Sequence, residues 1–282
     1  MKKSSTNRCL SIWILCIASS CISVPTESMA NKPAPDSVRS ILQEKEEHFS
    51  FIQELSPSAA CILEQSSGNI IVGPSPDQAG HLSVKVVAKG NNLAELQQLM
   101  ASVKIETVEK SNEKFHFRAV HRNIEKKTAQ MSLSVTFELQ IPLGRNLVAT
   151  TVSGNISVNN VASTGTYQLT SASGDVKVAQ LTGPVQIATA SGDIIAKNLN
   201  GSVMLTTASG DIHFDDMHPS DINGTAVTNT GDIHYSLPQG MFEKINDKAL
   251  RLTTQSNHVL MLSTSYGSIR AEKRDDDQHA QR

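Results

Sequence analysis

The fold is decided by one stretch of the sequence, residues 165–214, which reads GTYQLTSASGDVKVAQLTGPVQIATASGDIIAKNLNGSVMLTTASGDIHF. Its glycines recur every nine residues without error, at positions 165, 174, 183, 192, 201 and 210. Apolar residues hold the second and fourth positions after each glycine, and such alternate residues point to the same side of a β-strand. A repeat of this kind buries its apolar side only against neighbouring copies. The stretch therefore predicts an all-β fold, a β-solenoid built of stacked coils.

The true repeating unit is two nonapeptides long, because two features alternate between successive copies. Aspartate follows the glycine only in every second copy. The seventh position alternates between alanine and a larger residue, in the order Ala172, Leu181, Ala190, Leu199, Ala208 and Met217. These alternations predict a flattened 18-residue coil of two unlike half-coils, with one edge lined by Ser, Thr and Asp. The glycines are expected to allow turn conformations that a side chain would penalise.

The pattern extends beyond this stretch in both directions. It slips at Pro219 and resumes at Gly231, which follows Gly210 by twenty-one positions where the regular spacing would give eighteen. Gly240 and Gly267 keep the new phase, and an earlier copy, Ser153-Gly154-Asn155-Ile156, precedes the regular run. Residues 143–271 are therefore predicted to form about seven coils, followed by a polar, disordered tail at residues 272–282.

Residues 48–142 are predicted to form a β-rich part with a single helix. The helix is expected around Leu93 to Val103, with an apolar stripe made by Leu93, Leu96, Leu99 and Met100. A strict alternation from Met131 to Ile141 predicts a strand that ends at Pro142. Residues 31–47 are expected to be a leader with a short helix capped by Ser37, in which one face is shared by Val38, Ile41, Leu42 and Lys45.

The first thirty residues have the features of a signal peptide. A basic start with Lys2, Lys3 and Arg8 precedes an apolar run over residues 9–24, and small residues precede a cleavage site after Ala30. A lipoprotein signal that uses Cys21 is the alternative. The apolar run is shorter than the roughly 20 residues that a membrane-spanning helix needs. The protein is therefore expected to be exported, as a periplasmic, envelope-associated or secreted protein. Cleavage would leave only Cys61, which is expected to be a buried apolar residue rather than a reactive thiol.

The recurring motif Thr-x-Ser-Gly-Asp-Ile resembles the family DUF4097, an adhesin-like domain of bacterial envelope proteins. Its copies occupy residues 171–176, 189–194, 207–212 and 228–233. The likeness also includes Ser67-Gly68-Asn69-Ile70, the helix near Leu93 and the strand end at Ile141-Pro142, so that it covers about residues 48–271. It implies a β-solenoid in a bacterial envelope protein. It implies little about activity, because a fold alone does not specify function.

The polar edge of the coils is the predicted binding surface. Its candidate residues are Ser173, Asp175, Ser191, Asp193, Ser209, Asp211, Thr230 and Asp232. Each aspartate is expected to cap its own turn by accepting nearby backbone amides. A ladder of carboxylates that holds cations or a basic partner is the alternative. Calcium-binding nonapeptide repeats carry two glycines and an aspartate in every copy, a pattern that this sequence lacks.

Two histidines offer a possible metal site. His213 and His234 both lie three residues after a glycine and should face outward on neighbouring coils, with Asp215, Asp216 and His218 near them in sequence. Imidazole and carboxylate groups of this kind bind zinc. Outward histidines on a solvated sheet are nevertheless common, so the sequence favours no metal and no cofactor.

The sequence as a whole favours a binding module over an enzyme. Its 25 basic and 27 acidic residues leave no basic excess, which argues against a nucleic-acid partner. Nucleophile motifs and phosphate-binding loops are absent. The expected function is a non-enzymatic, adhesin-like or scaffolding module that binds a glycan or an envelope or surface protein. The alternatives are an envelope-stress or signalling module with a membrane or protein partner, and a carbohydrate-active enzyme. The last would need a cleft, which coils as short as these cannot build.

Overall fold

The computed structural model describes residues 42–122, 131–161, 165–215, 222–237, 242–246, 248–253 and 258–273. The expected signal peptide, the lipoprotein cysteine Cys21 and the leader up to residue 41 lie outside these residues, as do Met217, His218 and Asp216. No helix in the described part of the chain is long and apolar enough to cross a membrane.

The described residues form strands and one helix, in chain order. The elements are β1 (Gln43–Glu54), β2 (Ala60–Ser67), β3 (Ile70–Pro74), β4 (Ala79–Gly90), α1 (Leu93–Ala101), β5 (Val103–Lys110), β6 (Lys114–His121), β7 (Ser132–Ile141), β8 (Asn146–Ser153), β9 (Ile156–Asn159), β10 (Tyr167–Ser173), β11 (Val176–Thr182), β12 (Val185–Ser191), β13 (Ile194–Ser209), β14 (Ile212–Asp215), β15 (Ile222–Thr230), β16 (Ile233–Leu237), β17 (Phe242–Asn246), β18 (Ala249–Thr253), β19 (Val259–Thr264) and β20 (Ile269–Lys273).

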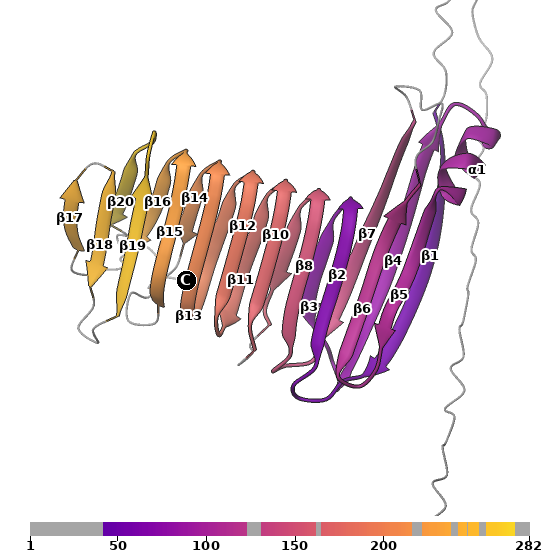
Figure 1. Ribbon diagram of the computed structural model, residues 1–282, viewed down its shortest axis with the longest axis horizontal. Coiled ribbons are helices and arrows are strands. Elements are labelled where there is room, and N and C mark those ends of the chain that lie inside the picture. Colours follow the sequence, from indigo (N-terminus) through magenta and orange to yellow (C-terminus); the bar gives the residue numbers. More distant parts are fainter. Residues whose placement is uncertain are drawn as a thin grey trace, which may run out of the picture.

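The strands build two sheets that face each other along the stack. Sheet A runs in the order β1, β4, β7, β3, β9, β11, β13, β14, β16, β20, and sheet B in the order β5, β6, β2, β8, β10, β12, β13, β15, β19, β18, β17. The long strand β13 turns the corner and contributes to both sheets. Figure 1 shows the strands in a row along the long axis, from the indigo and magenta N-terminal part to the yellow last coil. The predicted all-β solenoid is therefore confirmed.

The register of the parallel strands gives the length of each coil. Val176 pairs with Ile194, and Val185 pairs with Val203, so the partners lie eighteen positions apart in both sheets. Ile212 pairs with Ile233, which is the predicted longer step of twenty-one positions. The sequence period therefore gives the physical register directly, because each copy lies beside the next.

The solenoid differs from the sequence-based expectation at both ends. Its first coil is β2 and β3, which pair in parallel with β8 and β9 although β4, α1, β5, β6 and β7 lie between them in the chain. The glycine of the copy expected near Gly240 lies outside the described residues. The strands that follow it, β17 and β18, form an antiparallel hairpin that pairs with the edge of β19, and Ile233 pairs directly with Ile269, thirty-six positions later. Residues 272 and 273, expected in the tail, belong to β20, and the rest of the expected tail lies outside the described residues.

Each half-coil buries its apolar positions in a different way. In sheet B the strands are straight and bury the second, fourth and sixth positions, such as Val185, Ile187 and Thr189. In sheet A the sixth residue adopts a left-handed conformation, with φ of 55° at Gln180 and 47° at Asn198. This turn of the backbone buries the seventh residue, Leu181 or Leu199, whereas the seventh position in sheet B is exposed alanine.

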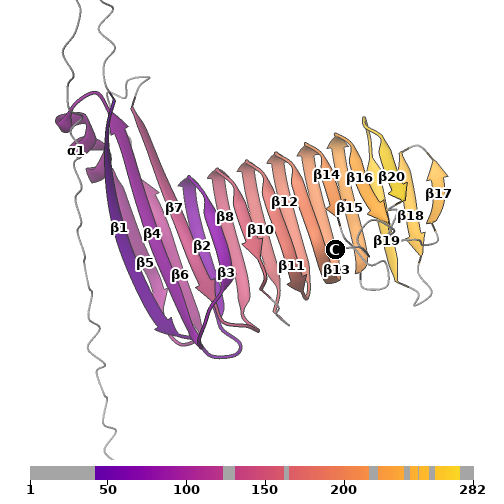
Figure 2. The same cartoon turned by 180° about the vertical axis from the view of Figure 1, so that it is seen from behind.

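The N-terminal part extends both sheets with antiparallel strands. β4 lies between β1 and β7 in sheet A, and β5 pairs with β6 at the end of sheet B. Figure 2 shows α1 at this end of the stack, beside β1 and β4. The helix begins after Asn92, whose side chain accepts the backbone N–H of Glu95 at 2.9 Å. It buries Leu96, Leu99 and Met100 as predicted.

Two expectations for this part are wrong. Leu93 is 57% exposed rather than part of the apolar stripe of α1. Residues 43–47, expected in a short helix, belong to β1, which pairs with β4 along its whole length. Tertiary pairing overrides the local helical pattern there, since Lys45 lies opposite Ala88 in an antiparallel ladder. Cys61 is fully buried in β2, in agreement with its expected role as a core residue.

Candidate functional site

The aspartates of the polar edge form one ladder along the stack. The carboxylate of Asp175 accepts the backbone N–H of Asp193 at 3.1 Å, and Asp193 accepts that of Asp211 at 2.8 Å. Asp211 in turn accepts the N–H of Asp232 at 2.7 Å, and Asp232 accepts that of Ser268 at 2.7 Å. The same ladder begins with the amide side chains of Asn69 and Asn155.

This ladder corrects the expectation that each aspartate caps its own turn. The donating amide belongs to the next coil, because neighbouring strands lie only about 4.8 Å apart. The bond from Ser268 is the main reason why the pKa of Asp232 is lowered. One carboxylate oxygen of each aspartate thus accepts a hydrogen bond inside the protein, and the carboxylates connect neighbouring coils.

The hydroxyls of the polar edge divide into two sets. Ser173, Ser191, Ser209 and Thr230 are exposed at the ends of their strands. The sixth-position threonines are buried instead, and each donates to the carbonyl oxygen of a glycine in the preceding coil. Thr189 bonds Gly174, Thr207 bonds Gly192 and Thr228 bonds Gly210, at 3.4, 3.2 and 2.9 Å. Sequence reasoning placed these threonines on the edge but missed their internal bonds, although burial of every second residue in a straight strand would have indicated them.

The two histidines lie together on the outer face of sheet A. His213 and His234 pair in register on β14 and β16, and their rings are parallel within 4°, with centroids 4.8 Å apart. The side chain of Asp211 lies beside them, and the ligand atoms of all three residues lie within 4.8 Å of one another. The longer step between Gly210 and Gly231 thus leaves the histidines aligned.

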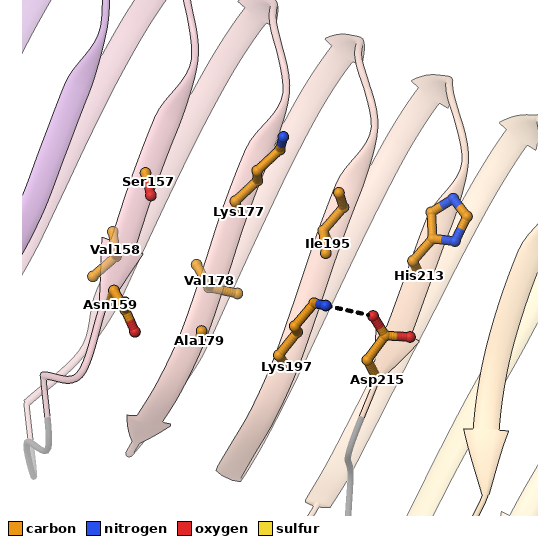
Figure 3. Close-up of a pocket in the computed structure, with 10 residues that line it drawn as sticks. All are labelled: Ser157, Val158, Asn159, Lys177, Val178, Ala179, Ile195, Lys197, His213 and Asp215. Carbon is orange, nitrogen blue, oxygen red and sulfur yellow. Dashed lines mark ion pairs between the residues drawn. The ribbon is translucent and has the colours of Figure 1, made fainter. Parts of the chain in front are cut away.

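A shallow depression on the same face begins next to His213. Figure 3 shows one row of side chains, Ser157, Lys177, Ile195 and His213, across β9, β11, β13 and β14. A second row is formed by Asn159, Ala179, Lys197 and Asp215, in which Lys197 and Asp215 form an ion pair of 3.0 Å. The outer face of sheet A is therefore charged and uneven.

The outer face of sheet B is of the opposite kind. Its six consecutive parallel strands β8, β10, β12, the second half of β13, β15 and β19 contain no Asp, Glu, Lys, Arg or His. Their outward positions carry small, amide and apolar side chains, among them Val152, Met204 and Val227, which are 55%, 52% and 40% exposed. We call the outward side of these six strands the neutral face. Its signal in the sequence is the missing charge at the outward positions, which the sequence analysis did not use.

Charged groups border the neutral face at both ends. On the N-terminal side, Glu64 of β2 accepts from Arg118 at 2.6 Å and contacts His116 at 2.9 Å. The bond from Arg118 is the largest reason why the pKa of Glu64 is lowered. On the other side, β18 carries Arg251. The absence of charge is thus confined to the regular coils.

Comparisons with solved structures give distant likenesses. A "putative cell adhesion protein" from Clostridium sporogenes is 8% identical, with a TM-score of 0.37 over 81% of this chain and 100% of the other. A "putative adhesin" from Bacteroides fragilis is 13% identical, with a TM-score of 0.35 over 81% and 97%. A "putative lipid binding protein" from Parabacteroides distasonis is 12% identical, with a TM-score of 0.24 over 80% and 96%.

No curated protein matches the chain. The family model described as Toastrack DUF4097 matches residues 61–272, from the first strand of the first coil to the last strand of the last. The resemblance found in the repeat motif is thereby confirmed, and the chain belongs to the Toastrack DUF4097 family.

Proposed function

We propose that this protein is a non-enzymatic binding module of an exported protein, and that it holds a protein partner on its neutral face. The observation that carries the proposal is the absence of charged residues from six consecutive strands of sheet B. Charged residues make up about a quarter of an average protein sequence. A run of this length without them therefore points to a surface with a specific use.

The composition of the neutral face favours a protein partner. The fully buried centre of a protein interface is marked by depletion of charged residues, while Met is enriched there. Met204 and Met261 lie in the same column of the neutral face, both in line with Thr225 of β15. Exposed Val152 on β8 and Val227 on β15 add apolar area. The parallel ladder beneath them is a rigid support, so that little conformational freedom is lost on binding.

The polar edge is a less favourable place for this interaction. Its aspartates already accept backbone amides, and the exposed Thr230 donates its hydroxyl to the carbonyl oxygen of Ala208 at 3.1 Å. We therefore place Ser173, Ser191, Ser209 and Thr230 at the rim of the proposed interface, where polar groups are tolerated.

Cys61, the cysteine in the described part of the chain, gives no support for catalysis. The thiol of Cys61 is enclosed in β2, and burial raises its pKa to about 12. Such a thiol is protonated at neutral pH and cannot act as a nucleophile.

The test is a photo-crosslinking amino acid placed at Met204 of the full chain in intact cells. We expect one discrete protein adduct, and no such adduct from the same probe at Ile195 on sheet A. The partner is then purified and titrated against the wild-type protein and the Met204→Lys variant by calorimetry. Burial of the new charge should weaken binding by at least about tenfold, while Ile195→Lys leaves binding unchanged.

Two results would overturn the proposal. Equal labelling from Met204 and Ile195 would remove the neutral face as the site of contact. Binding of a purified glycan that Met204→Lys abolishes would replace the protein partner by a carbohydrate. Cell fractionation tests export separately, and a protein confined to the cytosol would contradict that part alone.

A further inference from the structure

We propose that Asp211, His213 and His234 form a binding site for one divalent transition-metal ion of the zinc class, which joins two neighbouring coils. The site is independent of the neutral face, because it lies on sheet A. Among the described residues, this trio is the group of histidine, cysteine and acidic side chains with metal-binding geometry.

The chemistry of the three side chains suits zinc. Two imidazoles and one carboxylate give nitrogen and oxygen ligands, with a fourth position left for water, as in open zinc sites. Zinc–nitrogen bonds are about 2.0–2.1 Å long, so two nitrogens that share an ion lie at most about 4.2 Å apart. The ligand atoms of the trio lie within 4.8 Å of one another. Small rotations of the histidine side chains are therefore enough to close the site.

The backbone holds the two histidines in position. β14 and β16 are adjacent parallel strands, with Ile212 opposite Ile233, His213 opposite His234 and Phe214 opposite Tyr235. The residues on both sides of each histidine are buried in the core. The carboxylate of Asp211 is fixed in turn by its bond to the backbone N–H of Asp232. Such a hydrogen bond from the protein orients a metal ligand and raises affinity.

The charged groups around the trio permit a cation. Asp215 and Asp232 lie near the histidines, and Lys197 is paired with Asp215 at 3.0 Å. Arg270 is next to His234 in the column and interacts with Asp232. Three carboxylates thus face two cationic side chains. In the neighbouring coil, Ile195 takes the place of a histidine, so the ligand set is specific to the two coils on either side of the 21-residue step.

The test uses the full chain without a polyhistidine tag, stripped with EDTA and titrated with Zn²⁺ by calorimetry at pH about 7.5. We expect one ion per chain and a rise in the unfolding temperature with Zn²⁺ concentration, since the ion binds only the folded coils. His234→Gln and Asp211→Asn should each weaken binding by at least about tenfold. The Asn side chain keeps the acceptor for the N–H of Asp232, so Asp211→Asn removes the charge and leaves the ladder intact.

Two matched controls separate the site from ordinary surface groups. Asp175→Asn changes the same ladder position two coils away, and His81→Gln removes a histidine that pairs with Asp77 at 2.9 Å. Both should bind Zn²⁺ as the wild type does. Zn²⁺ binding that His234→Gln and Asp211→Asn leave unchanged would overturn the proposal, and so would a wild-type protein that binds no zinc. Circular dichroism of each apo variant checks that the fold is retained.

Discussion

The two half-coils use the same nine-residue spacing to build different structures. The sheet B half is a straight strand that ends in a buried hydroxyl, such as that of Thr207, bonded to the preceding coil. The sheet A half bends at a left-handed residue, such as Gln180, and ends in a buried leucine, Leu181. One edge of the coil is therefore closed by hydrogen bonds and the other by apolar packing. The outward faces of the two sheets also differ: the outer face of sheet A carries charged side chains, and the neutral face of sheet B carries none.

Glycine is needed at both edges of the coil, for close approach of the backbones as well as for conformation. At the polar edge, a Cβ on Gly192 would lie 2.3 Å from the carbonyl oxygen of Gly174 in the preceding coil, and Gly210 has a φ of +158°. At the opposite edge, a Cβ on Gly201 would lie 2.6 Å from the carbonyl oxygen of Gly183, and Gly201 has a φ of +131°, a conformation that side chains rarely adopt. The expectation that these glycines serve turn conformation therefore accounts for only part of their role.

The largest loss of stability is expected from adding a Cβ at the polar edge, where it would clash with the preceding coil. Gly192→Ala forces the backbones of two coils apart and should cost about 4 kcal/mol of unfolding free energy or prevent folding. Urea denaturation measures the loss. Gly73→Ala is the control, because a Cβ there meets nothing within 4 Å, and its stability should stay within about 0.5 kcal/mol of wild type. Equal stability of the two variants would show that the coils can move apart freely.

The apolar edge can be weakened at its buried leucine. Leu181→Ala removes a side chain that is 1% exposed and should cost about 3 kcal/mol through lost burial and the cavity left behind. The equivalent seventh position of the other half-coil, Ala190, is exposed, so Ala190→Ser should be nearly neutral. Thermal or urea unfolding compares them. A large cost for Ala190→Ser would mean that the two half-coils are not distinct.

The hydroxyl of the sheet B half can be removed without a change in shape. Thr207→Val leaves the carbonyl of Gly192 without its buried donor and should cost about 1–2 kcal/mol. Its neighbour Thr206 points outward and is exposed, which makes Thr206→Val the matched control with no loss expected. If both variants unfold at the same urea concentration, the buried hydroxyl of Thr207 does not contribute to the stability of the protein.

The smallest effect concerns the pH dependence of the polar edge. The pKa of Asp232 is lowered, chiefly by the backbone N–H of Ser268. A lowered pKa in the folded state stabilises the protein above the unfolded value and loses this contribution as the pH falls through the folded value. We expect the urea midpoint to fall when the pH is taken below the ordinary aspartate value of 3.8. Asp232→Asn retains the acceptor but cannot titrate, so the urea midpoint of this variant should fall less than that of the wild type. An identical fall in both proteins would show that Asp232 does not contribute to the pH dependence of stability.

The sequence predicts the periodic part of this fold well because each coil repeats the same contacts. The regular register, the one longer step and the two unlike half-coils all follow from positions of Gly, Asp and apolar residues. The inward turn of Leu181 depends instead on the left-handed conformation of Gln180, which the residue preference of glutamine does not indicate. The glycine spacing continues through this part of the sequence, yet β17 and β18 form an antiparallel hairpin instead of a coil. The glycine spacing alone could therefore not predict the hairpin.

The candidate sites were less predictable than the fold. The order of the aspartates along the chain predicted a ladder, but only the spacing of the coils shows that each carboxylate reaches the amide of the next coil. The histidines lie on either side of an irregular step, and their alignment depends on how the extra residues are accommodated. An absence of charged residues is harder to recognise in a sequence than a motif. The neutral face can be identified only when it is known which residues of the six strands point outward.

The early position of the first coil has a consequence for the order in which the chain folds. Regular coils bring together residues eighteen positions apart, whereas Cys61 of β2 pairs with Leu147 of β8, eighty-six positions later. Closing the longer loop costs about 1.4 kcal/mol more chain entropy. Local coils should therefore form first, and the first coil, β2 and β3, should be among the last to dock onto the stack. Until residues 146–159 are available, β2 and β3 can pair with β6 and β7 but lack the next coil, so this protein is expected to assemble from the middle of its sequence outward.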